Sequence, residues 1–185
     1  MPEANHFLGL ALAALGVLGV LAGAAALRFS AALRAGLSAF PRSKWPGWML
    51  AAVCMFWVAW VVSHAALGRF SAVKPYVPVL AVLAFAAIVY FLDELLSPRA
   101  LGGLLLLVAN PILNGVRWAD SAWRFVPAAI AYAWVVAGCA LMLHPWLFRK
   151  GVERLSAAPG AWRLLGWAKV AGGGVLLAAG LWQLR

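Results

Sequence analysis

The sequence is poor in charged and titratable side chains, and this scarcity limits the chemistry open to it. Its 185 residues include five Asp and Glu, three His and two Cys, and 11% of all residues are charged. Average soluble domains carry about 25% charged residues. No GxSxG, HExxH, Walker or dinucleotide-binding motif is present. The sequence therefore predicts a protein that is not an enzyme and that holds no metal or cofactor.

The few cysteines and histidines are spaced unfavourably for a metal or haem site. Cys54 and Cys139 both lie inside apolar runs, where small packing residues are expected. Bis-histidine haem ligation needs two imidazoles at one level of facing helices. His64 and His144 are expected near opposite edges of a membrane, so we expect no shared haem.

What the sequence has in abundance is apolar residues, which make up 66% of the chain. They form six solid runs of about the length that spans a bilayer as a helix, without the alternation of a barrel strand. These runs cover about residues 7–27, 48–67, 76–92, 100–116, 126–143 and 164–184. The sequence predicts an all-α, polytopic integral membrane bundle of about six transmembrane helices. The third and fourth runs are short, and four crossings are the alternative.

We expect a single transmembrane domain over residues 1–185, built from helical hairpins at about 7–67, 76–116 and 126–184. The formal net charge is +10, and nearly all Lys and Arg lie between the apolar runs. Lys and Arg concentrate in cytoplasmic loops of membrane proteins. The first, third and fifth connections hold nine of these residues, against five on the opposite side. This bias predicts both termini on the non-cytoplasmic side of a bacterial inner membrane, and no nucleic-acid partner.

The two longest connections, residues 28–40 and 146–155, have an apolar and a basic face at helical spacing. Such segments are typical of interfacial amphipathic helices that lie flat on a membrane, with their basic side toward anionic headgroups. The candidate headgroup-binding residues are Arg28, Arg34, Arg42, Lys44, Arg149, Lys150 and Arg154.

A faint internal repeat accompanies these two segments. Ala22-Gly23 with Arg34 can be laid on Ala137-Gly138 with Arg149 at one constant offset. Similarity this weak also arises by chance, so duplication is one hypothesis and chance is the alternative.

Residues 104–124 carry the most hydrogen-bonding capacity of any apolar segment. Asn110-Pro111 interrupts a run of leucines, and further polar residues follow within the same segment. One hypothesis is a polar path at a broken helix, as in transporters. The alternative, which we favour, is that the amides bond neighbouring helices and that Asp120 pairs with a flanking arginine in a solvated turn. The candidate residues are Asn110, Asn114, Arg117, Asp120 and Arg124.

Asp93 and Glu94 form an adjacent acidic pair at a predicted membrane edge. A proton or cation site is one interpretation. The favoured interpretation is a tight hairpin in which Ser97 or Asp93 caps the next helix.

Glycines in the first and last apolar runs indicate close helix packing. Small residues let helix backbones approach within a membrane. We expect the first and last helices to pack on each other or on another subunit through Gly19, Gly23, Gly172, Gly173 and Gly174.

These features favour a non-catalytic integral membrane subunit that packs within a larger membrane protein assembly. Its expected partners are anionic lipid headgroups and other membrane subunits, or further copies of the same chain. The second hypothesis is a small transporter or channel along Asn110, Asn114 and Arg117. The third is a lipid-modifying membrane enzyme that uses Asp93 or Glu94.

Overall fold

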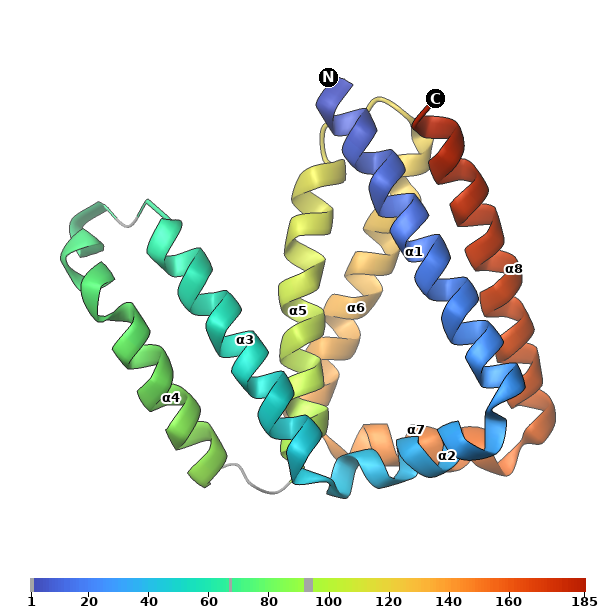
Figure 1. Cartoon of the computed structure of the whole chain (residues 1–185), viewed down its shortest axis with the longest axis horizontal. Coiled ribbons are helices and arrows are strands. Elements are labelled where there is room, and N and C mark those ends of the chain that lie inside the picture. The colour runs from blue at the N-terminus through green and yellow to red at the C-terminus, as the bar shows by residue number, and fades with distance from the viewer. Residues whose placement is uncertain (1, 67, 92–94) are drawn as a thin grey trace. The chain divides into compact units, whose positions relative to one another are not determined.

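The computed structural model describes residues 2–66, 68–91 and 95–185, and within these ranges it contains helices and no strands (Figure 1). This confirms the predicted all-α fold. In the described residues three 3-10 segments connect some of the helices: η1 (Phe40–Arg42), η2 (Gly68–Tyr76) and η3 (Ala122–Arg124). The same ranges contain eight α-helices: α1 (Pro2–Arg28), α2 (Ser30–Ala39), α3 (Lys44–His64), α4 (Val77–Phe91), α5 (Leu96–Val116), α6 (Phe125–Leu143), α7 (Trp146–Ala157) and α8 (Pro159–Gln183).

Six helices in the described residues are long and apolar enough to cross a membrane. The third and fourth apolar runs were expected to be short. The candidate spans that contain them have 21 residues each. The α-helix α5, which has all 21 residues of its span, measures about 31 Å, and this matches a hydrocarbon core of about 30 Å. The fourth span begins at Leu96, since Pro98 fits into the first turn of a helix without breaking it. The third span combines α4 with the end of η2 (Gly68–Tyr76).

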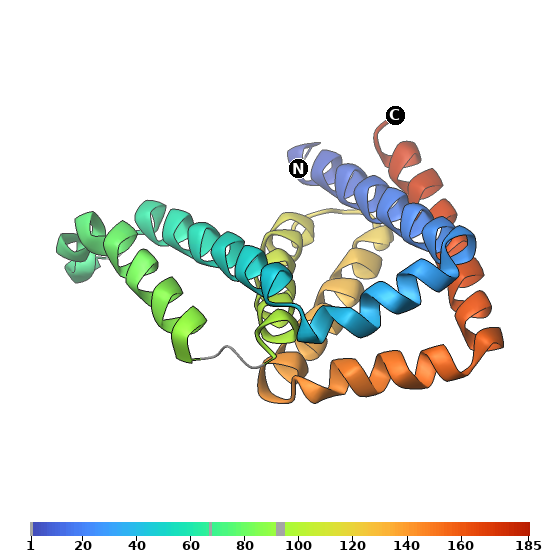
Figure 2. The ribbon, with the colours of Figure 1, turned by 60° about the horizontal axis from the view of Figure 1, so that its bottom comes forward.

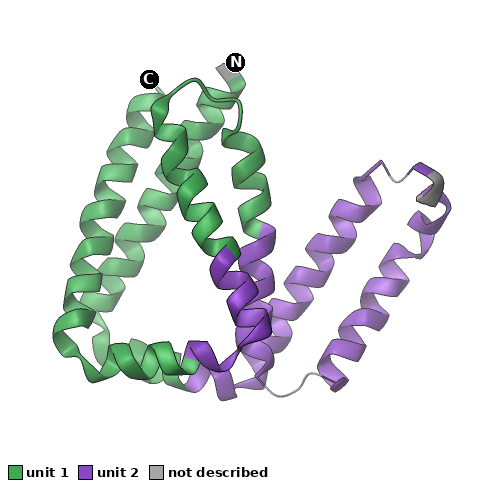
Figure 3. Cartoon of the chain, turned by 180° about the vertical axis from the view of Figure 1, so that it is seen from behind, with its two compact units in different colours: residues 1–38, 108–135, 149–185 green, residues 39–107, 136–148 purple. Residues whose placement is uncertain are grey.

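The chain forms two compact units, coloured separately in Figure 3. Unit 1 contains residues 1–38, 108–135 and 149–185, and unit 2 contains residues 39–107 and 136–148. Each unit therefore joins segments that lie far apart in the sequence. The helices α5 and α6 contribute to both units.

In unit 1, α1 and α8 lie side by side and antiparallel, and they form the most extensive helix pair (Figures 1 and 2). Glycines spaced seven residues apart on each helix make this close approach possible. We call these contacts the glycine seam. It pairs Gly9 with Gly180, Gly16 with Gly173, and Gly23 with Gly166.

The end of unit 1 that holds both termini has its own apolar core. Leu8 and Leu12 of α1 pack with Val116 and Ala119, and each of these four side chains is at most 2% exposed. Leu176 and Ala179 of α8 pack against the same cluster. The Gln183 amide donates to the Ser121 hydroxyl at 2.8 Å, so the end of α8 is also fastened to the loop after α5.

In unit 2, two pairs of helices approach closely at small residues. A Cβ on Gly102 of α5 would lie 2.7 Å from the Gly138 carbonyl oxygen of α6, and the reverse distance is also 2.7 Å. The start of α3 meets the start of α5, where the buried Ser97 hydroxyl donates to the Ser43 carbonyl at 2.6 Å. A Cβ on Gly47 would lie 2.9 Å from that hydroxyl, so the contact needs glycine.

The helix boundaries agree with the offset of the faint repeat. A shift of 115 residues carries the end of α1, Arg28, onto the end of α6, Leu143. The same shift carries the start of α3, Lys44, onto the start of α8, Pro159. The short helices α2 and α7 lie between these boundaries in both halves. This agreement supports the duplication hypothesis more strongly than the few matching residues do.

Candidate functional site

The polar segment of α5 differs from the predicted broken helix. The helix continues through Pro111 to Val116. The Asn114 amide donates to the Asn110 side-chain oxygen at 3.0 Å, and both residues are exposed. The two amides are four residues apart, which places them on one face of the helix. They bond each other along α5, so the interhelical amide bonds of the favoured interpretation are not formed in the described part of the chain.

The loop after α5 is held by its backbone rather than by ion pairs. The Asp120 amide donates to the Asn5 side-chain oxygen at 3.1 Å, and the Arg124 guanidinium donates to the Ala119 carbonyl at 2.8 Å. We expected Asp120 to pair with Arg117 or Arg124. Within the described residues it pairs with neither, and its contact with α1 is made by its backbone amide.

Three of the five candidate polar residues line one pocket of about 540 Å³ in unit 1. Pockets of about 300–1,000 Å³ are typical of small-molecule sites. We call it the arginine pocket; its walls are Leu113, Asn114, Val116, Arg117, Arg124, Phe125, Ala128 and Tyr132.

The arginine pocket has a positive polar side and no acidic residue in its walls. The Arg117 guanidinium lies 5.2 Å from the Trp118 ring centroid, and that of Arg124 lies 5.0 Å from the Phe125 centroid. Cation–π contacts of this kind orient a guanidinium without neutralising its charge. The pocket can therefore accommodate a ligand that has an anionic group and an apolar body. Asn110 and Asp120 are not among its walls.

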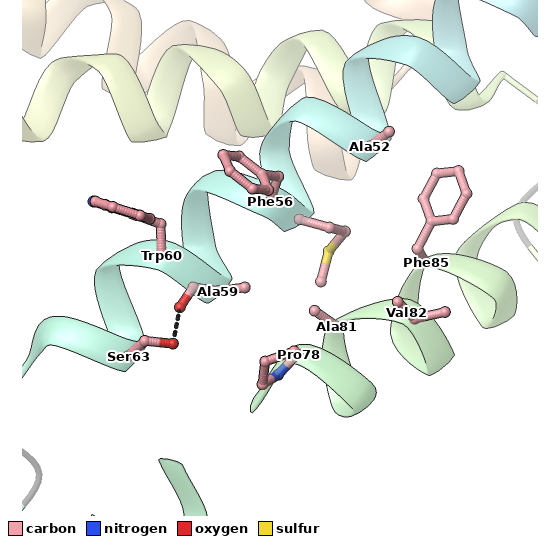
Figure 4. Close-up of a pocket in the computed structure, with 10 residues that line it drawn as sticks. Ala52, Phe56, Ala59, Trp60, Ser63, Pro78, Ala81, Val82 and Phe85 are labelled. Atoms are coloured by element: carbon pink, nitrogen blue, oxygen red, sulfur yellow. Dashed lines mark hydrogen bonds between the residues drawn. The ribbon is translucent and has the colours of Figure 1, made fainter. Parts of the chain in front are cut away.

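A second cleft, of about 410 Å³, lies between α3 and α4 in unit 2 (Figure 4). Alanines on both helices leave this space, and large apolar side chains border it. The Ser63 hydroxyl, among its walls, donates to the Ala59 carbonyl at 2.7 Å. We call it the α3–α4 cleft; its walls are Ala52, Met55, Phe56, Ala59, Trp60, Ser63, Pro78, Ala81, Val82 and Phe85.

The acidic pair Asp93 and Glu94 lies outside the described residues. Ser97, which we expected as a helix cap, instead donates to Ser43 before α3. The reason is its burial at the contact between two helix starts, where its hydroxyl is held by a partner distant in sequence.

Of the seven candidate headgroup-binding residues, six are exposed: Arg28, Arg42, Lys44, Arg149, Lys150 and Arg154. Arg149 pairs with Glu153 at 3.3 Å along α7. Arg34 differs from the others because it is half-buried, and its guanidinium carbon lies 5.1 Å from the Trp162 ring centroid.

Among the predicted packing glycines, Gly23 and Gly173 belong to the glycine seam, and Gly19 lies beside it, where a Cβ would be 3.1 Å from the Gly173 Cα. Gly172 and Gly174 border open space, because consecutive helix positions point in different directions. Sequence reasoning missed Gly9, Gly16, Gly166 and Gly180. Their spacing of seven residues was the signal that would have found them.

The chain matches no protein-family model, no curated protein sequence and no solved structure.

Proposed function

We propose that the protein is a non-catalytic integral membrane subunit that packs within a larger membrane protein assembly. The observation that supports this proposal is the exposure of the α3–α4 hairpin. In the most apolar stretch of the third span 6% of residues are buried, against 33% for α5. The α4 helix has its main contacts with α3 and η2.

The proposed partner is an apolar transmembrane helix of another subunit, seated along the α3–α4 cleft. The cleft has a small-residue floor at Ala59 and Ala81, bordered by Phe56, Trp60 and Phe85. A large aliphatic or aromatic side chain fits such a floor. The Ser63 hydroxyl in the walls already donates to its own helix, so it needs no acceptor from the partner.

Site-specific photocrosslinking in the native membrane tests this proposal. A photoreactive residue at Ala59 or Val82, both in the cleft, is expected to yield a discrete adduct with one membrane protein. The matched control is Leu164 on α8, which is 71% exposed and lies outside the cleft. Adducts with lipid alone at all three positions, together with a monomer in mild detergent, would overturn the proposal.

A second candidate function is transport of a small anion, and the arginine pocket favours it. Asn114, Arg117 and Arg124 of the predicted path all line this pocket. Proteoliposomes loaded with chloride are the simplest test. This candidate predicts chloride flux that Arg117→Ala and Arg124→Ala reduce, and equal flux in protein-free liposomes would exclude a chloride path.

A further inference from the structure

Arg34 lies where the first and last spans reach one edge of the membrane. The first span ends at Arg28 and the last begins at Pro159, so Arg34 on α2 and Trp162 on α8 both lie close to that edge. The Arg34 guanidinium carbon is 5.1 Å from the centre of the Trp162 ring. The contact joins two segments of unit 1 that are far apart in the chain.

Trp162 is a fixed platform for this guanidinium. Its side chain is 3% exposed, and its indole N–H donates to the Ala26 carbonyl at 2.9 Å. That carbonyl is in the last turn of α1, where helix carbonyls lack intrahelical partners. The burial of the ring and the bond from its N–H thus fix the indole against which the Arg34 guanidinium lies.

The Arg34 guanidinium has no counter-charge in the described part of the chain. Its Nε is buried and has no hydrogen-bond partner. The described carboxylates lie elsewhere: Glu3 begins α1, Asp120 follows α5, and Glu153 pairs with Arg149. A partly buried charge without a partner is unfavourable, and a buried donor normally has an acceptor.

We propose that Arg34, held on Trp162, binds the phosphate of an anionic phospholipid headgroup. A guanidinium with one face on an aromatic ring still offers its terminal Nη nitrogens to a phosphate. Headgroup phosphates are the anions concentrated at the depth where transmembrane helices end. Arg28, six residues before Arg34, adds positive charge at the same edge. This site is independent of the α3–α4 cleft and of any protein partner.

The chain contains its own control for this site. Arg149 occupies the position equivalent to Arg34 at the 115-residue offset of the repeat. Its guanidinium is exposed and neutralised by Glu153 at 3.3 Å. Arg149 therefore has the same side chain at a matched place in α7, without the aromatic platform and without an unmet donor.

Native mass spectrometry of the full-length protein in mild detergent tests the proposal, with phosphatidylglycerol as the probe and phosphatidylcholine as the neutral comparison. Arg34→Ala is expected to weaken phosphatidylglycerol binding about fivefold or more, the effect of losing one basic contact at a membrane surface. Arg149→Ala is expected to leave it unchanged, because the ion pair with Glu153 sets Arg149 apart from the other candidate headgroup-binding residues. Arg34→Lys keeps the charge but not the planar fork, so it is expected to give an intermediate affinity.

Two outcomes would overturn the proposal. Equal losses in Arg34→Ala and Arg149→Ala mean that the basic residues act as a diffuse charge and not as a site. Displacement of phosphatidylglycerol by millimolar inorganic phosphate means that the site takes a free anion and not a lipid. If Arg34→Ala does not fold, Arg34→Lys is the deciding variant. A phosphatidylglycerol affinity equal to that of the wild type would show that the site does not need a guanidinium.

Discussion

Gly16 of α1 and Gly173 of α8 face each other so closely that neither position has room for a side chain. A Cβ on Gly16 would lie 2.7 Å from the Gly173 carbonyl oxygen, and a Cβ on Gly173 would lie 2.7 Å from the Gly16 carbonyl oxygen. Both obstructing atoms are backbone, so a substitution must push the helices apart. This pair is the middle of the glycine seam in unit 1.

The first prediction is that Gly173→Ala lowers the thermal stability of the detergent-solubilised protein. Inserting a methyl group into a closed contact typically costs about 1–3 kcal/mol. Gly172→Ala and Gly174→Ala are the matched controls, since nothing lies within 4 Å of a Cβ at either position. Alanine favours a helix by about 1 kcal/mol over glycine, so the controls are expected to keep or gain stability. Tryptophan-fluorescence melting measures all three, and equal losses would contradict the glycine seam.

The second prediction concerns the fastening of α5 to the segment before α3. Ser97→Ala removes the buried bond from its hydroxyl to the Ser43 carbonyl and leaves that acceptor without this donor. A loss of about 1–3 kcal/mol is expected. Ser63→Ala is the control, because Ser63 bonds its own helix at Ala59. Thermal unfolding compares the two variants. A Ser97→Ala protein as stable as the control would show that this hydrogen bond does not stabilise the fold.

The third prediction concerns the loop after α5. Asn5→Ala removes the acceptor of the Asp120 amide, so faster hydrogen exchange is expected at that amide. Asn114→Ala serves as the comparison, since the bond it removes runs along one exposed helix face. Hydrogen-exchange mass spectrometry of peptides that contain Asp120 reports the change. Unchanged exchange in Asn5→Ala would show that other contacts fix the loop.

The fourth prediction is that Trp162→Phe destabilises unit 1 by about 1 kcal/mol, because the hydrogen bond to the Ala26 carbonyl is lost while an aromatic ring remains. Trp167→Phe on the same helix is the control, as Trp167 is 63% exposed. Chemical unfolding in detergent measures both variants. A loss of stability of similar size in both variants would mean that the hydrogen bond of the Trp162 indole N–H does not account for the effect.

The sequence was sufficient for the helices and for the class of fold, because solid apolar runs of spanning length have one stable conformation in a membrane. The sequence was also sufficient to predict that Gly19, Gly23 and Gly173 lie at a helix contact, since small residues mark close helix contacts. It was not sufficient for Gly172 and Gly174, whose exclusion from the seam depends on how α8 is rotated about its axis.

The polar contacts were harder to predict because their partners are distant in the chain. Asp120 was expected to pair with its neighbours, but its backbone bonds Asn5, 115 residues away. The hydrogen bond between Trp162 and Ala26 joins residues 136 positions apart, and no local sequence pattern predicts it. Arg117 and Arg124 were correctly singled out as candidates, yet the pocket they share with Tyr132 required the folded positions of α5 and α6.

The most direct test of the claim on which the rest depends, that these helices cross a membrane, is cysteine accessibility in intact cells. Single cysteines replace Ser38, Ser71, Ser121 or Ser156 in a protein whose Cys54 and Cys139 are changed to alanine, and an impermeant maleimide is added from outside. One span separates Ser38 from Ser71, which is the first residue of the third span, and one separates Ser121 from Ser156. Two spans lie between Ser71 and Ser121, so these two positions share a side. Labelling is expected at Ser71 and Ser121, with Ser38 and Ser156 protected until the membrane is opened. Labelling of Ser38 and Ser71 from the same side would contradict it.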